Sequence, residues 1–297
     1  MRMRLGALDL DVDIGGGDAP VALIGPNGSG KTTTVECLQG LRVPDAGTMD
    51  ILGCDPASDR SVLRTRVGCQ LQDSALPDRL KVWEALDLFA SLAPGADDWV
   101  RLVEEWGLAS KRSAAFADLS GGQQQRLFIA LALVNKPELV FFDEMTTGLD
   151  PASRRVAWEL IRQIRDGGAT VVLVTHFMDE AEHLCDRVAV LRAGRVVACD
   201  TPGALIASTT AGVTVTFTCD VEDLGWLQRV PGVAEVSRSG SRVAIQGAGP
   251  VLVRTAAALA AHGLEPEDLD VERRTLEDAY LALAEQPSAA TAEGLAG

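Results

Sequence analysis

The sequence has no long hydrophobic run, no excess of positive charge and no paired cysteines. Its longest strongly apolar run, residues 127–134, is too short to cross a bilayer, and the first residues show no signal-peptide pattern, so we expect no direct membrane insertion. The net charge of −15, with Lys and Arg scattered along the chain, argues against nucleic acid as a partner. The six cysteines form no C-x-x-C motif and are expected to be reduced thiols of a cytosolic protein.

The length and composition predict one large domain and a smaller one. With 297 residues, 47% of them hydrophobic, the chain can bury a substantial core. The composition changes after residue 203, and we place the large domain at 1–208, with a helical subdomain at about 80–118. A smaller α+β domain is expected at 209–286, and the small, polar residues of 287–297 predict a disordered tail.

One glycine-rich stretch fits the phosphate-loop pattern G-x-x-x-x-G-K-[ST]. It follows an apolar run at 21–24 that predicts a buried strand, and it opens a helix predicted at 32–38. Glycines let the backbone wrap round a phosphate group with its N–H donors pointing inward, and the helix adds its positive N-terminal end. The predicted nucleotide-binding residues are Gly25, Pro26, Asn27, Gly28, Ser29, Gly30, Lys31, Thr32 and Thr33.

Three residues have specific predicted roles in binding phosphate and metal. Lys31 is expected to reach the β- and γ-phosphates, and the hydroxyl of Thr32 is expected to ligate Mg²⁺. A buried strand predicted at 139–142 ends at an acidic pair, and ligands of doubly wound sheets lie at such carboxyl ends. Asp143, the first member of this pair, is expected to hold Mg²⁺ directly or through water.

The candidates for catalysis are Glu144, His176 and Lys31. Glu144, the second acidic residue, is expected to polarise the water that attacks the γ-phosphate. His176 follows a strand predicted at 170–174, next to the expected position of the γ-phosphate, which it is predicted to sense. His183 and His262 lie on helical stretches and are expected to be structural.

Two predicted helix starts add further candidates. An apolar helix begins within Leu119–Arg126, where a serine is a good N-cap and two glycines leave the helix N-terminus open to an anion. Asp150 precedes a proline, which is typical of a helix N-cap, and both capping and a functional role are expected for it. The candidates at the first helix start are Ser120, Gly121, Gly122 and Gln123.

The remaining periodicity gives coarser predictions for the first 110 residues. Alternation of apolar and polar residues predicts a half-buried strand at 8–14. Shorter apolar runs predict two more strands, at 48–52 and 66–71. Helical spacing predicts two helices separated by a Pro-Gly break, at 81–92 and 97–106.

Together these elements resemble the ATP-binding subunit of ABC transporters over roughly residues 5–210. The phosphate loop, the signature Leu119–Arg126, the acidic strand and the histidine occur in the family's order, and the signature is the most diagnostic element. The resemblance implies an α/β fold: a phosphate-loop ATPase core of mixed sheet and flanking helices, a helical subdomain and an antiparallel β subdomain, plus a small α+β C-terminal domain. It also implies that ATP is the nucleotide and that Gln72, rather than Gln70, contacts Mg²⁺.

The resemblance further implies partners. Two such subunits, expected to form a homodimer, would hold ATP between the phosphate loop of one and Ser120–Gly122 of the other, with Asp150 communicating across the interface. The segment 73–83 and the helices after it would form a groove for a cytoplasmic helix of an integral membrane permease. The protein is therefore expected on the inner face of the cell membrane.

The sequence departs from the family pattern at two places. The family usually has an aromatic residue upstream that stacks on adenine, and Met1 to Arg4 offer none, so how adenine is held stays open. Met145 replaces a proline that usually follows the acidic pair, and we expect this to be tolerated. Separately, residues 135–138 hint at the N-K-x-D motif of GTPases, but Glu138 and the Lys-Pro pair favour a loop.

The C-terminal region favours an exporter. Strands predicted at 213–218, 233–237, 242–246 and near 269–271, with helices at 223–229, 251–262 and 275–283, are compatible with a split βαβ sandwich. The segments 275–283 and 176–182 resemble multidrug and antibiotic-resistance exporter ATPases, which implies export of a drug, antibiotic or lipid-like substrate, with a regulatory or dimerising C-terminal domain. Alternatives are an import ATPase and a soluble ABC-type ATPase acting on ribosomes or chromosomes. Importers of the molybdate type, which the short N-terminus resembles, carry a different, barrel-like C-terminal module.

Overall fold

The computed structural model divides the chain into two compact units, Met1–Pro202 and Gly203–Gly297. It describes residues 2–5, 8–11, 20–71, 74–93, 95–96, 98–208, 213–221, 223–272 and 274–285. The predicted site residue Gln72 and the predicted tail at 287–297 lie outside the described residues. Within the described ranges, no helix combines the length and the apolar character that crossing a bilayer requires.

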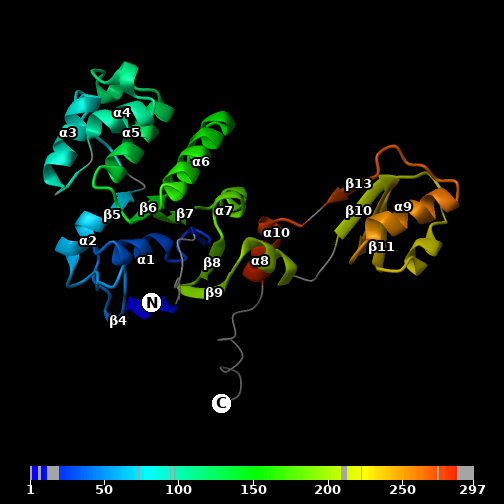
Figure 1. The fold of residues 1–297 in the computed structure, drawn as a ribbon. Helices are drawn as coiled ribbons and strands as arrows, with labels where there is room; N and C mark the ends of the chain where they lie inside the picture. Colours follow the sequence, from blue (N-terminus) through cyan, green and yellow to red (C-terminus); the bar gives the residue numbers. More distant parts are fainter. Residues whose placement is uncertain are drawn as a thin grey trace, which may run out of the picture. The chain divides into compact units, whose positions relative to one another are not determined.

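A six-stranded mixed sheet forms the centre of the first unit (Figure 1). The strand order is β5-β6-β7-β3-β8-β9, and all strands run parallel except β9, which is antiparallel to β8. β3 and β6 are buried along their whole length, which explains why they read as continuous apolar runs. The strands are β3 (Val21–Ile24), β5 (Val67–Gln70), β6 (Leu139–Asp143), β7 (Thr170–Val174), β8 (Arg187–Arg192) and β9 (Arg195–Asp200).

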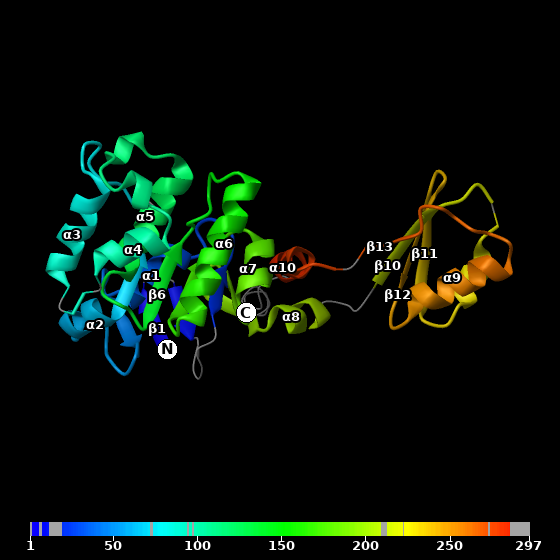
Figure 2. The same ribbon diagram turned by 45° about the horizontal axis from the view of Figure 1, so that its top comes forward.

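Helices of the first unit fall into two groups. Figure 2 shows three of them, α3, α4 and α5, gathered into one helical cluster, which also includes two short 3-10 turns at Ala109–Lys111 and Phe116–Asp118. The cluster helices are α3 (Val82–Leu92), α4 (Trp99–Glu105) and α5 (Gly121–Leu133). The helices that alternate with the central strands are α1 (Lys31–Leu38), α2 (Arg60–Arg66), α6 (Pro151–Asp166) and α7 (Met178–Leu184). The sequence did not predict α2, because its seven residues are mostly polar and show no apolar period.

A small antiparallel sheet of order β2-β1-β4 completes the first unit. Its strands are β1 (Arg2–Leu5), β2 (Leu8–Asp11) and β4 (Ala46–Thr48). The prediction of a strand at 48–52 is wrong beyond Thr48. The chain turns there because the carboxylate of Asp50 accepts a hydrogen bond from the Gly53 N–H at 2.8 Å, and Leu52 and Gly53 have φ values of 53° and 78°.

The second unit contains a four-stranded antiparallel sheet of order β11-β12-β10-β13. With α9 between β12 and β13, this is the split βαβ order expected from the sequence, although the first connection is only a short 3-10 turn, η3. Phe217, Ile245 and Leu259 lie in its core. The elements are α8 (Pro202–Ser208), β10 (Val213–Thr218), η3 (Gly225–Arg229), β11 (Val233–Ser239), β12 (Arg242–Gly247), α9 (Val251–Ala261), β13 (Asp270–Glu272) and α10 (Leu276–Glu285).

Candidate functional site

The phosphate-loop residues connect β3 to α1. The ammonium group of Lys31 is buried and donates hydrogen bonds to the carbonyl oxygens of Gly25 at 2.8 Å and Pro26 at 3.2 Å. The hydroxyl of Ser29 is buried and has no hydrogen-bond partner in the described part of the chain. Thr32, in the first turn of α1, is exposed. A buried cation and an unused hydroxyl in one loop fit an anionic group of the size of a phosphate.

Glycines are required in this loop for two different reasons. A Cβ at Gly25 would lie 2.4 Å from the carbonyl oxygen of Leu191 in β8 and 2.6 Å from the hydroxyl of Ser29. Gly28 and Gly30 instead have φ values of 79° and 103°, which residues with a side chain rarely adopt. Gly25 therefore allows the loop to pack closely against β8, and Gly28 and Gly30 allow its backbone to turn.

The acidic pair lies at the carboxyl end of β6, beside the phosphate loop. Asp143 is buried, and Glu144 has a φ of 49° while its N–H donates to the carbonyl of Val174 at 2.9 Å. Burial lowers the pKa of Lys31, and the negative charges of Glu144 and Asp143 oppose that shift. His176, after β7, places its Nδ1 3.4 Å from Oε1 of Glu144. The structure therefore brings the three predicted catalytic residues to one edge of the sheet.

The signature residues lie at the start of α5, in the helical cluster. Ser120 is exposed, and its N–H donates to the side-chain oxygen of Gln123 at 3.0 Å, so Gln123 caps its own helix. A side-chain hydrogen bond of 3.1 Å from Gln125 to Gln70 connects this helix to the end of β5. The signature thus sits on a separate element that is linked to the core sheet.

Asp150 is the N-cap of α6, as the sequence predicted. One carboxylate oxygen accepts hydrogen bonds from the N–H groups of Ala152 at 2.9 Å and Ser153 at 3.0 Å, and the other accepts from the Ser153 hydroxyl at 2.7 Å. The hydrogen bond from that hydroxyl is the main reason that the pKa of Asp150 lies below its ordinary value. The cap leaves the side chain exposed at the start of a long helix.

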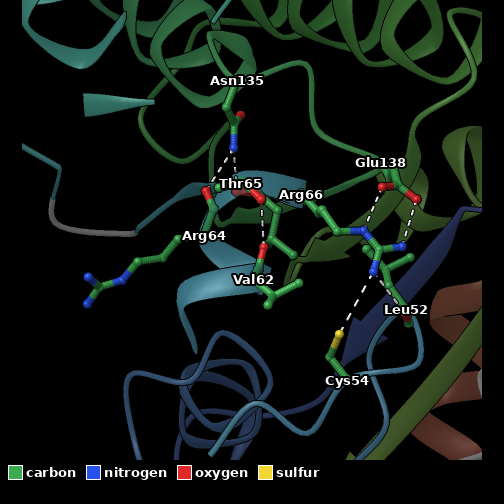
Figure 3. Close-up of polar contacts among 9 residues, drawn as sticks. Leu52, Cys54, Val62, Arg64, Thr65, Arg66, Asn135 and Glu138 are labelled. Atoms are coloured by element: carbon green, nitrogen blue, oxygen red, sulfur yellow. Dashed lines mark hydrogen bonds and ion pairs between the residues drawn. The ribbon is translucent and has the colours of Figure 1, made fainter. Parts of the chain in front are cut away.

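Residues 135–138 form a loop with a structural role, as the sequence favoured (Figure 3). Glu138 forms a bidentate ion pair with Arg66, with N–O distances of 2.6 Å and 2.9 Å. The side-chain amide of Asn135 donates to the carbonyls of Arg64 and Val67, each at 3.1 Å. These contacts join the start of β6 to the end of α2.

Some predictions concern parts that the structure does not describe, and one buried group was missed. Gln72 lies outside the described residues, as do the side chains of Met1 to Arg4, which include no aromatic residue for adenine. Met145, expected to be tolerated in place of the family's proline, is buried directly after the acidic pair. Sequence reasoning missed Glu180, which is fully buried although it lies in the acidic run 179–182, where a carboxylate is expected to be exposed.

Comparisons with known proteins agree with this geometry. The ABC transporter family model matches residues 9–147. Nod factor export ATP-binding protein I of Paraburkholderia xenovorans is 44% identical over 192 residues, which are 63% of this chain and 63% of that protein. Daunorubicin resistance ATP-binding protein DrrA3 of Streptomyces coeruleorubidus is 35% identical over 275 residues, which are 88% of this chain and 85% of that protein.

Two solved structures are also similar. One, the ATP-binding subunit of an ABC transporter, is 32% identical with a TM-score of 0.57, and the match covers 63% of this chain and 80% of that one. The other, a bacterial ABC transporter cassette solved as a dimer, is 26% identical with a TM-score of 0.57, and the match covers 66% and 90%. On this sequence identity, motif order and fold, the chain belongs to the ATP-binding proteins of the ABC transporter family.

Proposed function

We propose that this chain is the ATP-hydrolysing subunit of an exporter and powers the passage of a drug, antibiotic or lipid-like substrate through a separate membrane permease. The observation that carries the proposal is the meeting of Lys31, Asp143, Glu144 and His176 at one sheet edge. Relatives named for Nod factor export and daunorubicin resistance support export as the direction. The activity is expected at the inner face of the cell membrane.

The phosphate loop binds the nucleotide in this proposal. The N–H donors of residues 25–33 and the ammonium of Lys31 hold the β- and γ-phosphates, and the unused hydroxyl of Ser29 is available to a phosphate oxygen. Thr32 and Asp143, with Gln72, are the residues that would hold Mg²⁺. Bound there, Mg²⁺ neutralises charge that develops on the phosphates.

Glu144 and His176 act on the attacking water and the γ-phosphate. The Glu144 carboxylate accepts the proton of the water, and the His176 imidazole holds the γ-phosphate in line with it. The 3.4 Å separation of their side chains supports a shared task.

A second copy of the chain completes the site in this proposal. A Cβ added at Gly121 would meet no heavy atom within 4 Å, and one at Gly122 would meet only the Ser153 hydroxyl, at 3.8 Å. Packing within this chain therefore does not require glycine at either position. An open helix N-terminus with exposed Ser120 instead suits the close approach of phosphate groups held by the partner, and the related cassette solved as a dimer supports this arrangement.

A hollow beside the helical cluster suits a helix of the permease. Its volume is about 620 Å³, and it is lined by α2, β5, α3 and α5. Phe89 and Leu92 both line it and are 39% and 74% exposed, so two large apolar side chains are available to a protein partner at this hollow. The groove expected from the sequence comprises 73–83 and the helices after it. The hollow includes Phe89 and Leu92 of those helices, but its lining begins at Ser61 and includes none of residues 74–83.

The second unit has a regulatory or dimerising role in this proposal. Its open four-stranded sheet differs from the barrel-like module of molybdate-type importers. This difference favours an exporter over that class of importer.

The proposal is tested by affinity purification from solubilised native cells, with the full-length Glu144→Gln variant as bait and ATP present. Recovery of a multi-span membrane protein at stoichiometric yield is the expected result. Adding Leu92→Asp to the bait should release that protein, whereas Leu41→Asp, at a leucine that is 59% exposed outside the hollow, should not. Recovery of ribosomal or chromosomal proteins without a membrane protein would contradict the proposal.

A further inference from the structure

Glu180, on α7, is a fully buried carboxyl residue that none of the proposed roles uses. Burial raises its pKa, while the nearby polar groups of Thr175, Thr146 and Trp158, together with the charge of Arg154, oppose that rise. Burying a carboxyl group costs free energy unless polar partners compensate for the lost water. Because burial of the Glu180 carboxyl group costs this free energy, we expect the group to have a role that an apolar side chain could not perform.

The partners of Glu180 belong to the elements that carry the proposed catalytic residues. Thr146 lies two positions after Glu144, in the loop that leads to α6, and is itself fully buried. Thr175 directly precedes His176, and its hydroxyl accepts a hydrogen bond from the Phe177 N–H at 3.0 Å. The carboxyl group of Glu180 thus lies where the loops after β6 and β7 meet.

The contacts of this carboxyl group are only partly formed. The indole N–H of Trp158, on α6, donates to Oε1 of Glu180 at 3.2 Å. Oε2 of Glu180 and the hydroxyl of Thr146 are buried, and neither has a well-formed hydrogen bond within the described residues. The Thr146 hydroxyl is nevertheless close enough to influence the pKa of the carboxyl group. A small movement of the loop would therefore complete this hydrogen bond, which matters because a buried polar group left without a partner is costly.

Further contacts fasten α6 to α7 around Glu180. The guanidinium carbon of Arg154 lies 3.9 Å from the centre of the Phe177 ring, and its Nη1 lies 3.7 Å from a carboxylate oxygen of Asp179. One turn further along α6, the ring of Trp158 stacks on His183 with 5.1 Å between centroids. These contacts attach α6 to α7 and to Phe177, which directly follows His176.

We propose that Glu180 is a positioning residue for ATP hydrolysis, whose carboxyl group fixes the loops of Glu144 and His176 relative to each other and to α6. The inference rests on the proposed roles of these two residues. Because α6 begins at Asp150, displacement of that helix changes the same contacts. Displacing a catalytic group by about 1 Å can lower a rate by about 10²-fold, so a support of this kind has a large expected effect.

The test compares steady-state ATP hydrolysis of the full chain in several variants. Glu180→Ala should lower kcat by about 10²-fold through misplacement of the loops, while KM for ATP stays within about threefold because the phosphate loop is untouched. Glu180→Gln keeps an acceptor for Trp158 and should retain kcat within about fivefold, a rescue that bulk packing alone does not predict. Trp158→Phe should lower kcat, whereas the matched change Trp106→Phe should not, because the buried indole N–H of Trp106 has no hydrogen-bond partner in the described chain.

If Glu180→Ala does not fold, the variant Thr146→Val tests the positioning role of Glu180. Thr146→Val conserves volume, so it should fold, lower kcat by about tenfold and leave KM unchanged. Its effect and that of Glu180→Gln should be non-additive, as for residues in direct contact. Wild-type kcat in folded Glu180→Ala or Thr146→Val would overturn the inference. If Glu144→Gln also hydrolysed ATP normally, the proposed function itself would fail; if Glu144→Gln were impaired, only the role of Glu180 would.

Discussion

Nδ1 of His176 lies 3.4 Å from Oε1 of Glu144, although 31 residues separate the two along the chain. The register of the central sheet explains this proximity, because Asp143 and Val174, the last residues of β6 and β7, are paired partners. The loops that follow β6 and β7 therefore begin at the same level of the sheet. The φ of 49° at Glu144 redirects the backbone at this point, and strain of this kind in a residue with a side chain is typical of functional sites.

Replacing Glu144 by Gln should separate nucleotide binding from turnover. The amide has the shape of the carboxylate but cannot accept the proton of the attacking water, so we expect hydrolysis to fall by about 10²-fold or more. ATP affinity should be retained, since the phosphate loop is unchanged. Phosphate release under single-turnover conditions and equilibrium nucleotide binding measure the two quantities.

A matched control for this variant is Glu159→Gln. Glu159 is exposed on α6 and forms an ion pair of 3.2 Å with Arg162, three residues further along the same helix, so its replacement should leave turnover unchanged. Near-normal hydrolysis by Glu144→Gln would remove that residue from the catalytic role.

The core of the site was predictable because its residues follow patterns with few alternatives. The phosphate loop requires glycine at fixed spacing, and Asp143 and Glu144 end a strand whose apolar run is unmistakable. The turn at Asp50 and the polar helix α2 were not predictable, since side-chain hydrogen bonds and tertiary contacts decide them. Glu180 was not predictable either, because burial of a carboxylate depends on Trp158 and on two loops distant in sequence.

Two glycines of the phosphate loop should respond differently to substitution. Gly25→Ala places a Cβ against the backbone oxygen of Leu191, which cannot move freely, so we expect a loss of about 1–3 kcal/mol in unfolding free energy. At Gly28 there is space for a Cβ but φ is positive, so Gly28→Ala should cost roughly 1–2 kcal/mol of backbone strain. Gly28→Asn should recover part of this loss, since asparagine tolerates positive φ. Denaturant titration measures the unfolding free energy of each variant. Equal losses for Gly28→Ala and Gly28→Asn would contradict the explanation by positive φ.

The cap at Asp150 should make stability depend on pH in a defined direction. The folded-state pKa of Asp150 is lowered, chiefly by the Ser153 hydroxyl, so the ionised side chain stabilises the fold above its ordinary pKa of 3.8. This contribution is lost as the pH falls through the folded-state pKa. The difference in Tm between wild type and Asp150→Asn should therefore be largest near neutral pH and shrink in acid. A Tm difference that stays constant with pH would refute this account. In a Ser153→Ala background, the Tm difference caused by Asp150→Asn should be smaller at neutral pH.

The exposed start of α5 gives the sharpest test of the two-subunit site. Ser120→Arg puts a long cation where a second chain is proposed to present its nucleotide, but it touches no residue of this chain's own phosphate loop. We therefore expect the monomer to bind ATP normally, while the ATP-dependent dimer and hydrolysis are both lost. Light scattering in the Glu144→Gln background, with and without ATP, measures the dimer, and Ser110→Arg, at an exposed serine elsewhere in the helical cluster, is the matched control. Because the arginine side chain would occupy the space in front of the N-terminus of α5, a dimer that survives Ser120→Arg would mean that the partner's phosphates are not held at this helix.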